Sequence, residues 1–374
     1  MKIVIIIGLI ILFFIAGYSF GSKELPLNQS IKNLFTSFFI QKDLNIYEEI
    51  NPIFYKTDVE KLIEINSDKD IYEKREQLKK FIWKNSFPGN SEIQLEKNIS
   101  LEKFSNLKNL SKIDKLSTIM DYGLISNSYL FSPINSNQEL IIYHEGHAGD
   151  VVNGIESIQI LLDNNYTVLA MTLPLLGDNN NPEVDIERIG VITLEKHNDF
   201  IFLDSDDFSS IKFFMEPIFS NLNFLEKNYQ FKTFHMIGLS GGAWATTIYP
   251  AIDTRIEKSF PVGGPLPLFL TINVPGSYGD YETNLPELYK ITNYLELYIM
   301  GSHGDDRKQL KIINKYDSCC YGGITYKLFD SLIAQKLELL EKGKFEIFLD
   351  ESHYSHKISE LAMTKILNVL KDNL

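Results

Sequence analysis

Cysteine and positive charge are both scarce in this sequence. Only two cysteines, Cys319 and Cys320, occur among 374 residues, so a disulfide framework cannot hold the chain together. The two are neighbours and could form a vicinal disulfide in an oxidising compartment, but we favour a pair of small buried thiols near the functional site. Lysine and arginine number 36 against 49 aspartates and glutamates, and the net charge of -13 argues against nucleic acid and other polyanions as partners.

Apolar residues, in contrast, are plentiful. Hydrophobic residues form 44% of the chain and charged residues 23%, which is enough to bury one sizeable core. No internal repeat is apparent. One main domain with an extension is the organisation that fits best.

The N-terminus differs from everything that follows it. An almost wholly apolar run over residues 3–20 follows Lys2, and this pattern is typical of an export signal or a single membrane anchor within residues 1–22. Its length suits a retained anchor, whereas Ser19 and Gly21 would suit cleavage, so both alternatives stay open. Either way, the short basic head predicts that the large C-terminal part lies outside the cytoplasm, anchored or exported.

Residues 23–118 are expected to form an N-terminal extension that packs on the main domain, residues 119–374. Apolar side chains recur on one face of a helix predicted over residues 71–83. The residues on this face are Ile71, Leu78, Phe81 and Ile82. An amphipathic helix of this kind must bury its apolar face against a neighbour.

From about residue 122, strand-length apolar runs alternate with helical patterns. This alternation predicts an α/β fold with a mostly parallel central sheet flanked by helices on both faces. Strands are expected over residues 124–131, 140–143, 166–171, 231–237, 256–262, 294–300 and 345–349, and helices over 155–162, 210–227, 328–340 and 358–370.

The sequence Gly-Leu-Ser-Gly-Gly over residues 238–242 joins an apolar strand to a predicted helix. A serine hydroxyl attacks a carbonyl carbon only when it is held clear of its neighbours, and a tight strand-to-helix turn does this. The turn needs nearly side-chain-free residues two before and two after the serine, and Gly238 and Gly242 stand there. We therefore predict Ser240 as the nucleophile.

Two backbone N–H groups should stabilise the oxyanion that forms when the carbonyl is attacked. The N–H of Gly241 is the first candidate, because it directly follows the nucleophile. The second should come from the loop after an earlier strand, where Glu145, Gly146 and His147 stand. We predict the N–H of His147 or of a neighbour.

An acid and a base should follow the serine, each at the carboxyl end of a strand. The loop after the strand expected over residues 294–300 offers Asp305, our choice, and Asp306, which could instead cap a helix that begins at Arg307. Asp317 is a weaker third candidate. The loop before the last helix offers two histidines. Of these we prefer His356 to His353 as the base.

From about residue 120 to residue 374 the chain resembles the α/β-hydrolase superfamily of serine hydrolases and esterases, since elbow, acid loop and histidine loop follow in the family's order. The resemblance implies an α/β-hydrolase fold and a Ser240-His356-Asp305 triad that forms an acyl-enzyme without metal or organic cofactor. The expected reaction is hydrolysis of a carboxylic ester or related acyl substrate, either small or lipid-like. A lid-like insertion is expected over residues 265–293, whose apolar side chains could equally well pack the insertion on the core.

Several alternatives to an esterase remain. An acyltransferase or a peptidase could use the same triad, and a noncatalytic binding protein could share the fold. A metal-dependent hydrolase would use histidines along one sheet edge, although their spacing does not match the helical His-Glu-x-x-His site. The histidines considered for it are His144, His147, His303, His353 and His356.

Overall fold

The computed structural model describes residues 45–187, 189–271 and 279–372. The chain divides into two units, Met1–Glu48 and Glu49–Leu374. Of the first unit only the short helix α3, Asn45–Glu48, is described, so the apolar segment predicted over residues 1–22 lies outside the described residues. Within the described ranges, no helix has both the length and the apolar character that a membrane span requires.

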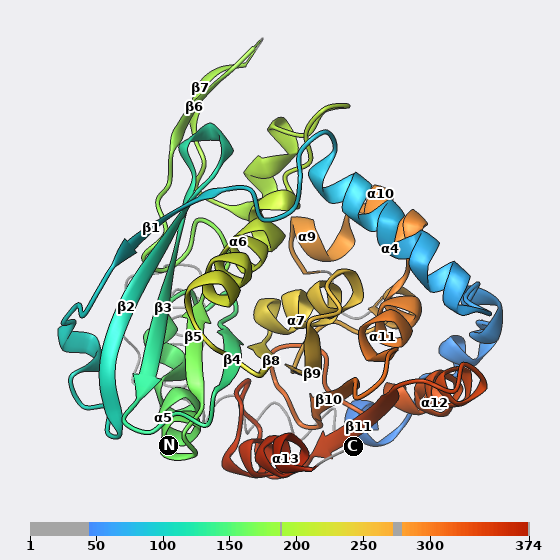
Figure 1. Ribbon diagram of the computed structural model, residues 1–374. Helices are drawn as coiled ribbons and strands as arrows, with labels where there is room; N and C mark the ends of the chain where they lie inside the picture. Colours follow the sequence, from blue (N-terminus) through green and yellow to red (C-terminus); the bar gives the residue numbers. More distant parts are fainter. Residues whose placement is uncertain (1–44, 188, 272–278, 373–374) are drawn as a thin grey trace, which may run out of the picture. The chain divides into compact units, whose positions relative to one another are not determined.

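A nine-stranded sheet forms the centre of the second unit (Figure 1). Its strands are β1 (Glu92–Glu96), β2 (Leu110–Ile119), β3 (Ile125–Pro133), β4 (Glu139–His144), β5 (Thr167–Met171), β8 (Thr233–Leu239), β9 (Ile256–Val262), β10 (Lys308–Asn314) and β11 (Lys344–Asp350). Their order in the sheet is β1-β2-β3-β5-β4-β8-β9-β10-β11. Neighbours from β1 to β5 pair antiparallel, and all pairs from β5 to β11 are parallel. The predicted α/β-hydrolase fold, with its mostly parallel sheet, is confirmed.

Helices cover both faces of this sheet (Figure 1). One hydrophobic cluster packs α4 (Asp68–Trp83), α6 (Lys212–Asn228), α7 (Gly241–Ile252), α11 (Tyr294–Ser302) and α12 (Asp330–Leu339) on one face. A second cluster packs α5 (Ile155–Asp163) and α13 (Glu360–Lys371) on the other. The parallel strands between these layers are therefore buried on both sides, which explains their continuous apolar runs.

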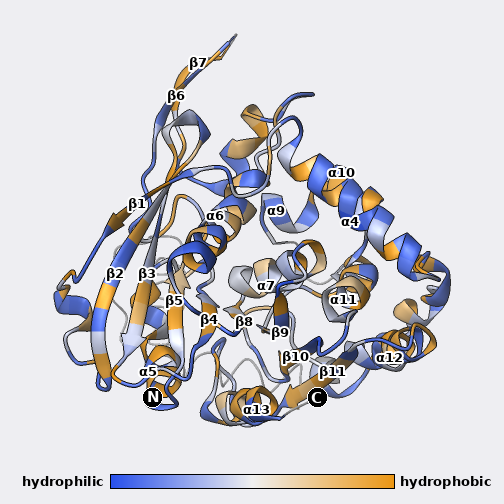
Figure 2. Ribbon diagram, viewed as in Figure 1, coloured by the Kyte–Doolittle hydropathy of each residue, from blue (hydrophilic) through white to orange (hydrophobic). Residues whose placement is uncertain are grey.

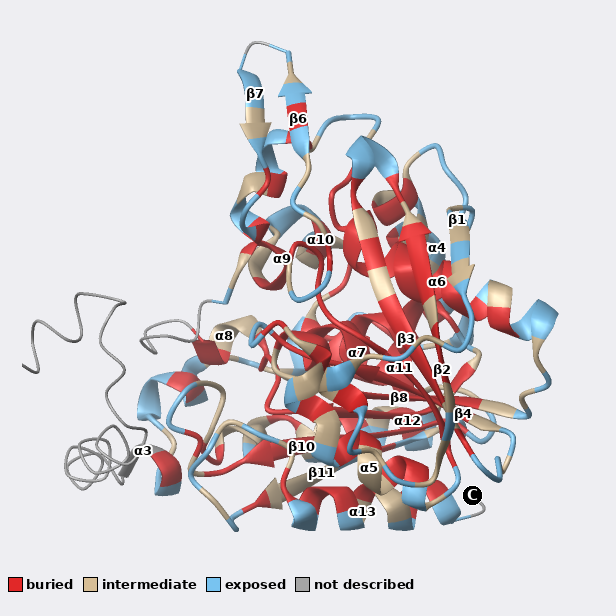
Figure 3. Cartoon of the chain, turned by 90° about the vertical axis from the view of Figure 1, so that its left-hand side faces the viewer, coloured by how far each residue is buried: buried red, intermediate tan, exposed pale blue. Residues whose placement is uncertain are grey.

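The remaining elements are short. They are the helices α8 (Leu268–Thr271), α9 (Tyr281–Asn284) and α10 (Pro286–Ile291), the hairpin of β6 (Glu183–Ile186) and β7 (Gly190–Thr193), and 3-10 helices at Pro52–Lys56, Glu60–Leu62, Glu102–Phe104, Asp121–Gly123, Val151–Gly154, His197–Phe202 and Thr325–Leu328. Figure 3 shows the hairpin as a projection with mostly exposed residues, whereas the central strands are buried.

The amphipathic helix predicted over residues 71–83 is present as part of α4. Ser67 caps its first turn by accepting the backbone N–H of Asp70. The helix mixes polar and apolar residues along its length (Figure 2), and its buried side chains join the cluster that also contains α6 and α7. The sequence predicts that the main domain begins at residue 119. The first two strands of the sheet, β1 and β2, lie before or end at that residue.

One strand was predicted in the wrong place. The run expected as a strand over residues 294–300 is the helix α11, and the following segment, expected to start a helix at Arg307, leads into the strand β10. Asn293 and Glu296 form a capping box at the start of α11. Because this helix is buried along its whole length, it lacks the polar face that distinguishes a helix from a buried strand in a sequence.

Candidate active site

Ser240 lies on a sharp turn between the carboxyl end of β8 and the first residue of α7. Its backbone has φ 59° and ψ −118°, a conformation that residues other than glycine adopt only when their surroundings impose it. A Cβ atom on Gly238 would lie 2.1 Å from the carbonyl oxygen of Gly242, so strand and helix can approach this closely only with glycine there. This is the strand-turn-helix geometry predicted for a nucleophile elbow.

Backbone hydrogen bonds hold the elbow in place. The N–H of Ser240 donates to the carbonyl oxygen of Val262, at the end of β9, over 3.0 Å. The carbonyl oxygen of Ser240 accepts the N–H of Trp244 over 3.1 Å, one turn into α7. Ser240 itself is only half-buried. A substrate can therefore reach a serine whose backbone is fixed from both sides.

His356 meets Asp317 and neither Asp305 nor Asp306. The Nδ1 atom of His356 lies 2.5 Å from Oδ2 of Asp317, a buried carboxylate three residues beyond the end of β10. Such a contact fixes the orientation of the imidazole and the position of its proton. The weakest of the three acid candidates from the sequence thus occupies the place that we predicted for Asp305.

Asp305 and Asp306, the two carboxylates predicted as acids, lie near the amino ends of the parallel strands, opposite to Ser240. Because β10 and β11 are parallel and pair Lys308 with Lys344 at their first residues, the loop that holds Asp305 and Asp306 adjoins their amino ends. Ser240 and Asp317 follow the carboxyl ends of β8 and β10. The strand β10 has seven residues, so at about 3.3 Å per residue its amino and carboxyl ends are roughly 20 Å apart. The wrong assignment of residues 294–300 as a strand caused this error. The loop with Asp305 and Asp306 follows a helix, α11, and precedes the strand β10, so it does not lie at the carboxyl end of a strand.

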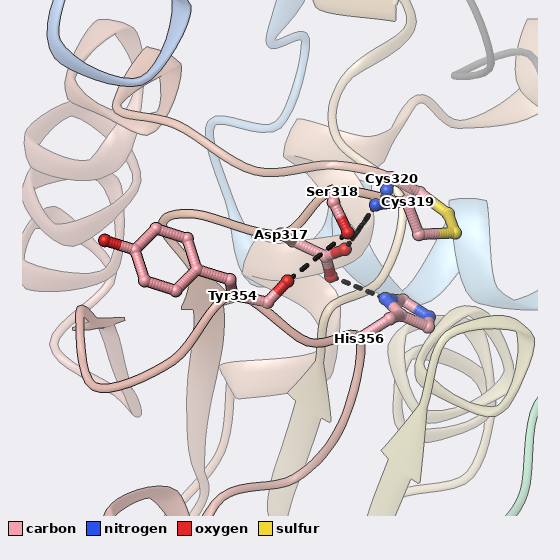
Figure 4. Close-up of a disulfide and its surroundings, with 6 residues drawn as sticks. All are labelled: Asp317, Ser318, Cys319, Cys320, Tyr354 and His356. Atoms are coloured by element: carbon pink, nitrogen blue, oxygen red, sulfur yellow. Dashed lines mark hydrogen bonds and ion pairs between the residues drawn. A yellow bond between two sulfur atoms is a disulfide. The ribbon is translucent and has the colours of Figure 1, made fainter. Parts of the chain in front are cut away.

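A disulfide joins Cys319 and Cys320, which corrects our preference for two free thiols (Figure 4). The backbone N–H groups of both cysteines donate to Oδ1 of Asp317, over 2.8 Å and 3.3 Å respectively. Both sulfur atoms lie within 4.8 Å of a ring nitrogen of His356. The disulfide therefore closes the turn whose amides position the carboxylate.

The imidazole of His356 also lies beside the elbow. A Cβ atom on Gly263 would lie 3.3 Å from Cε1 of His356, and Gly263 directly follows the residue that accepts the N–H of Ser240. The other ring nitrogen of His356, Nε2, is buried and has no hydrogen-bond partner among the described residues. A buried nitrogen of this kind, next to an elbow serine, is available to take up a proton.

His353 has different surroundings. Its Nε2 atom lies 3.3 Å from Oδ2 of Asp350, and its Nδ1 atom accepts the backbone N–H of Ser355. Asp350 also accepts the hydroxyls of Ser352 and Ser359, the second of which caps α13. His353 is thus part of the network that joins the end of β11 to the last helix, whereas His356 contacts Asp317.

The predicted oxyanion loop does pass over the elbow. A Cβ atom on Gly146 would lie 2.7 Å from Cβ of Ser240 and 3.2 Å from the backbone nitrogen of Gly241. Gly241 starts α7, so its N–H lies at the positive end of a helix. His147 follows Gly146, and its ring packs against Gly241. The structure thus brings together the two residues predicted for the oxyanion hole.

The side chain of His147 is occupied by two carboxylates. Its Nε2 atom lies 2.8 Å from Oδ2 of Asp280 and 3.0 Å from Oε1 of Glu282. Burial alone would lower the pKa of His147, but the two carboxylates outweigh it and raise this pKa to about 9. Burial would raise the pKa of Glu282, yet His147 and His197 lower it to about 2. This network was not predicted from the sequence.

The five histidines considered for a metal-dependent hydrolase do not form one centre. His303 contacts Asp68 at the start of α4, and His353 contacts Asp350. Burial lowers the pKa of His144 to about 4, and its Nδ1 atom lies 2.9 Å from the carbonyl oxygen of Glu145.

The insertion over residues 265–293 contains α8, α9 and α10, while residues 272–278 lie outside the described part. Leu266, Leu270 and Leu288 are buried in the same cluster as α7 and α11. These side chains pack the insertion on the core, which is one of the two roles that we expected for its apolar residues. A role as a lid stays a prediction.

Comparison with known proteins places the fold. No protein-family model matches the sequence, and neither does any curated protein. Among solved structures, an acetyl xylan esterase from Paenibacillus sp. R4 is similar with a TM-score of 0.55 at 13% identity, over 84% of this chain and 98% of that one. Acetyl xylan esterase 1 from Thermoanaerobacterium sp. JW/SL YS485 reaches a TM-score of 0.50 at 14% identity, over 83% and 97%. At this identity the likeness establishes the α/β-hydrolase fold alone.

Proposed function

We propose that the protein is a serine hydrolase that cleaves carboxylic esters or related acyl substrates through an acyl-enzyme on Ser240. The observation that carries this proposal is the elbow serine together with His356, which a buried carboxylate, Asp317, holds beside it. A strained serine conformation of this kind is costly and is found mainly where function uses it.

The contact between His356 and Asp317 supports one tautomer of the imidazole for this mechanism. An ionised carboxylate only accepts, so Nδ1 of His356 carries the hydrogen and Nε2 presents a lone pair. Nε2 can therefore remove the proton from Oγ of Ser240 as this oxygen attacks the substrate carbonyl carbon. Asp317 then stabilises the imidazolium without taking the proton itself.

The remaining steps follow from the same groups. The N–H of Gly241 and an N–H of the loop at His147 donate to the oxyanion of the tetrahedral intermediate. When this intermediate collapses, the ester C–O bond breaks and the leaving alcohol takes the proton from Nε2 of His356. Water then attacks the acyl-enzyme with the same nitrogen as base, and Ser240 recovers its proton as the acid product leaves.

The proposed substrates are small or lipid-like acyl esters. Two proteins of similar fold are named as acetyl xylan esterases, which supports an ester as the bond cleaved, although fold alone does not choose the substrate. We also propose a location outside the cytoplasm, anchored or released, from the apolar segment over residues 1–22. The disulfide beside the site supports this location, since disulfides persist in oxidising compartments.

Turnover of a panel of p-nitrophenyl esters, from acetyl to long acyl chains, tests this proposal. The wild type should hydrolyse at least part of the panel, and Ser240→Ala should fall to background. Ser111→Ala, a change of an exposed serine on β2, serves as the matched control and should keep full activity. Equal turnover by wild type and Ser240→Ala would overturn the proposal, and cleavage of peptide amides without any ester turnover would overturn the choice of substrate.

A further inference from the structure

Four side chains that commonly bind metals converge beside the loop over the elbow. They are His147 from the loop after β4, His197 from the 3-10 helix His197–Phe202, and Asp280 and Glu282 at the start of α9. One ligand atom from each lies within 4.8 Å of the other three. We propose that this cluster binds a divalent transition-metal ion of the zinc type.

The hydrogen bonds of His197 give the first argument. Its Nε2 atom lies 3.0 Å from the carbonyl oxygen of Pro174, which can only accept, so Nε2 carries the hydrogen. In the neutral ring Nδ1 then presents a lone pair, and it points at Oε2 of Glu282 over 3.1 Å. Two acceptors at this distance need a proton or a cation between them.

His147 likewise has fewer donors than acceptors in this cluster. One nitrogen, Nε2, faces oxygens of both Asp280 and Glu282 at 2.8 Å and 3.0 Å. A single N–H has to be shared between the two oxygens in a three-centre hydrogen bond. A metal ion at the centre would satisfy the imidazole nitrogens and the carboxylate oxygens together.

Burial and charge give the second argument. Glu282 is fully buried and His197 nearly so, and two carboxylates carry two negative charges into this site. A divalent cation neutralises both charges while each imidazole stays neutral. Without a metal ion, protons alone balance these charges: one shared by the buried His197 and Glu282, and one on His147, whose side chain is 34% exposed.

The donor set and its spacing suit zinc. Two imidazoles and two carboxylates are ligands that Zn²⁺ accepts, at about 2.0–2.2 Å each, and a tetrahedral arrangement separates such ligands by roughly 3.3–3.5 Å. The closest nitrogen–oxygen pairs of this cluster are 2.8 Å to 3.1 Å apart and have to separate by a few tenths of an ångström. The more distant pairs, at up to 4.8 Å, have to approach one another to reach the tetrahedral spacing. The hydrogen bond from His197 to a backbone carbonyl is the outer contact that usually orients a metal-bound histidine.

The position of the cluster suggests what the metal would do. The ring of His147 packs against Gly241, and Asp280 and Glu282 belong to the insertion after β9. A metal ion would tie the predicted oxyanion loop to that insertion. We infer a positioning role, because the proposed acyl transfer from Ser240 already has its base in His356.

Metal binding to the full chain tests this inference independently of esterase activity. After dialysis against a chelator and then against buffer free of both chelator and metal, the protein should bind one equivalent of Zn²⁺ in titration calorimetry, and its thermal midpoint should rise on binding. Added Co²⁺ should give the intense visible absorption of a tetrahedral site. Glu282→Gln and Asp280→Asn should each weaken Zn²⁺ binding at least tenfold, and the second replaces a partly exposed side chain whose loss the fold tolerates more easily.

His303→Gln is the matched control, because this histidine also pairs with a carboxylate, that of Asp68 at the start of α4, but stands at the C-terminal end of α11 and is not part of the cluster. It should keep the full affinity. The inference is overturned if the wild type binds less than a tenth of an equivalent, or if wild type and both carboxylate variants bind Zn²⁺ alike. The cluster would then be a hydrogen-bonded network of imidazolium and carboxylate groups.

Discussion

Replacement of Asp317 by asparagine should remove nearly all turnover while the fold stays intact. The amide oxygen of asparagine can still accept the N–H groups of Cys319 and Cys320. Its NH₂ group would then face Nδ1 of His356 in place of Oδ2, and it would donate where the carboxylate accepts. The imidazole would then adopt the tautomer with its hydrogen on Nε2. In that tautomer Nε2 cannot accept the proton of Ser240.

The size of this effect follows from the loss of the base. The corresponding Asp-to-Asn change in serine proteases, where the histidine is trapped in the wrong tautomer, lowers kcat about 10⁴-fold. We expect a loss of 10³- to 10⁴-fold for Asp317→Asn, or about 4–5.5 kcal/mol in the activation free energy. The measurement is kcat and KM on the best ester of the panel, with the thermal midpoint as the check on folding.

Asp305→Asn is the matched control. It makes the same chemical change at the acid that the sequence favoured, but at the other edge of the sheet, and it should keep turnover within twofold of the wild type. If Asp305→Asn abolished turnover and Asp317→Asn did not, the placement of the acid at the carboxyl end of β10 would be refuted.

Three further outcomes are expected. His356→Ala should lower ester turnover at least 10³-fold, whereas His353→Ala should mainly lower the thermal midpoint, because His353 contacts the network before the last helix; the reverse pattern in a kinetic and melting comparison would contradict the assignment. Gly242→Ala should yield little folded protein, since the added Cβ would lie 2.0 Å from a backbone carbonyl oxygen, and a normal melting curve would count against so close an approach of strand and helix. In the metal-free protein, the raised pKa of His147 contributes stability that is complete below pH 6.5 and is lost as the pH rises through 9; we expect a loss of about 1–2 kcal/mol, reduced by solvent screening of this one-third-exposed side chain, and unfolding in urea at both pH values measures it.

Local patterns made the elbow predictable from the sequence. Gly238 is required by a contact with Gly242, four residues on, so this part of the pattern is local and visible in the chain. Gly242 is required by the carbonyl oxygen of His144 at the end of β4, and its place was predictable only because the Gly-x-Ser-x-Gly pattern includes it. The buried parallel strands are likewise continuous apolar runs. His356 stands before the last helix, and its place in the chain order of the family pointed to it.

Tertiary contacts decided what the sequence could not show. The strand β10 contains Lys311, a charged residue that argues against a buried strand, yet its ammonium group donates to the carbonyl oxygens of Gly264 and Pro265 in the fold. Once β10 was missed, Asp317 no longer followed a predicted strand. His197 and Glu282 are 85 residues apart, and no local spacing links them.

The most direct test of the proposed acyl-enzyme is covalent labelling of Ser240. A fluorophosphonate probe should add one adduct to the wild type, located by peptide mass spectrometry at Ser240, and it should leave Ser240→Ala unlabelled. Labelling should slow strongly in His356→Ala, because the base no longer takes the proton from Oγ. Equal labelling of wild type and Ser240→Ala, or an adduct on another residue, would contradict Ser240 as the nucleophile.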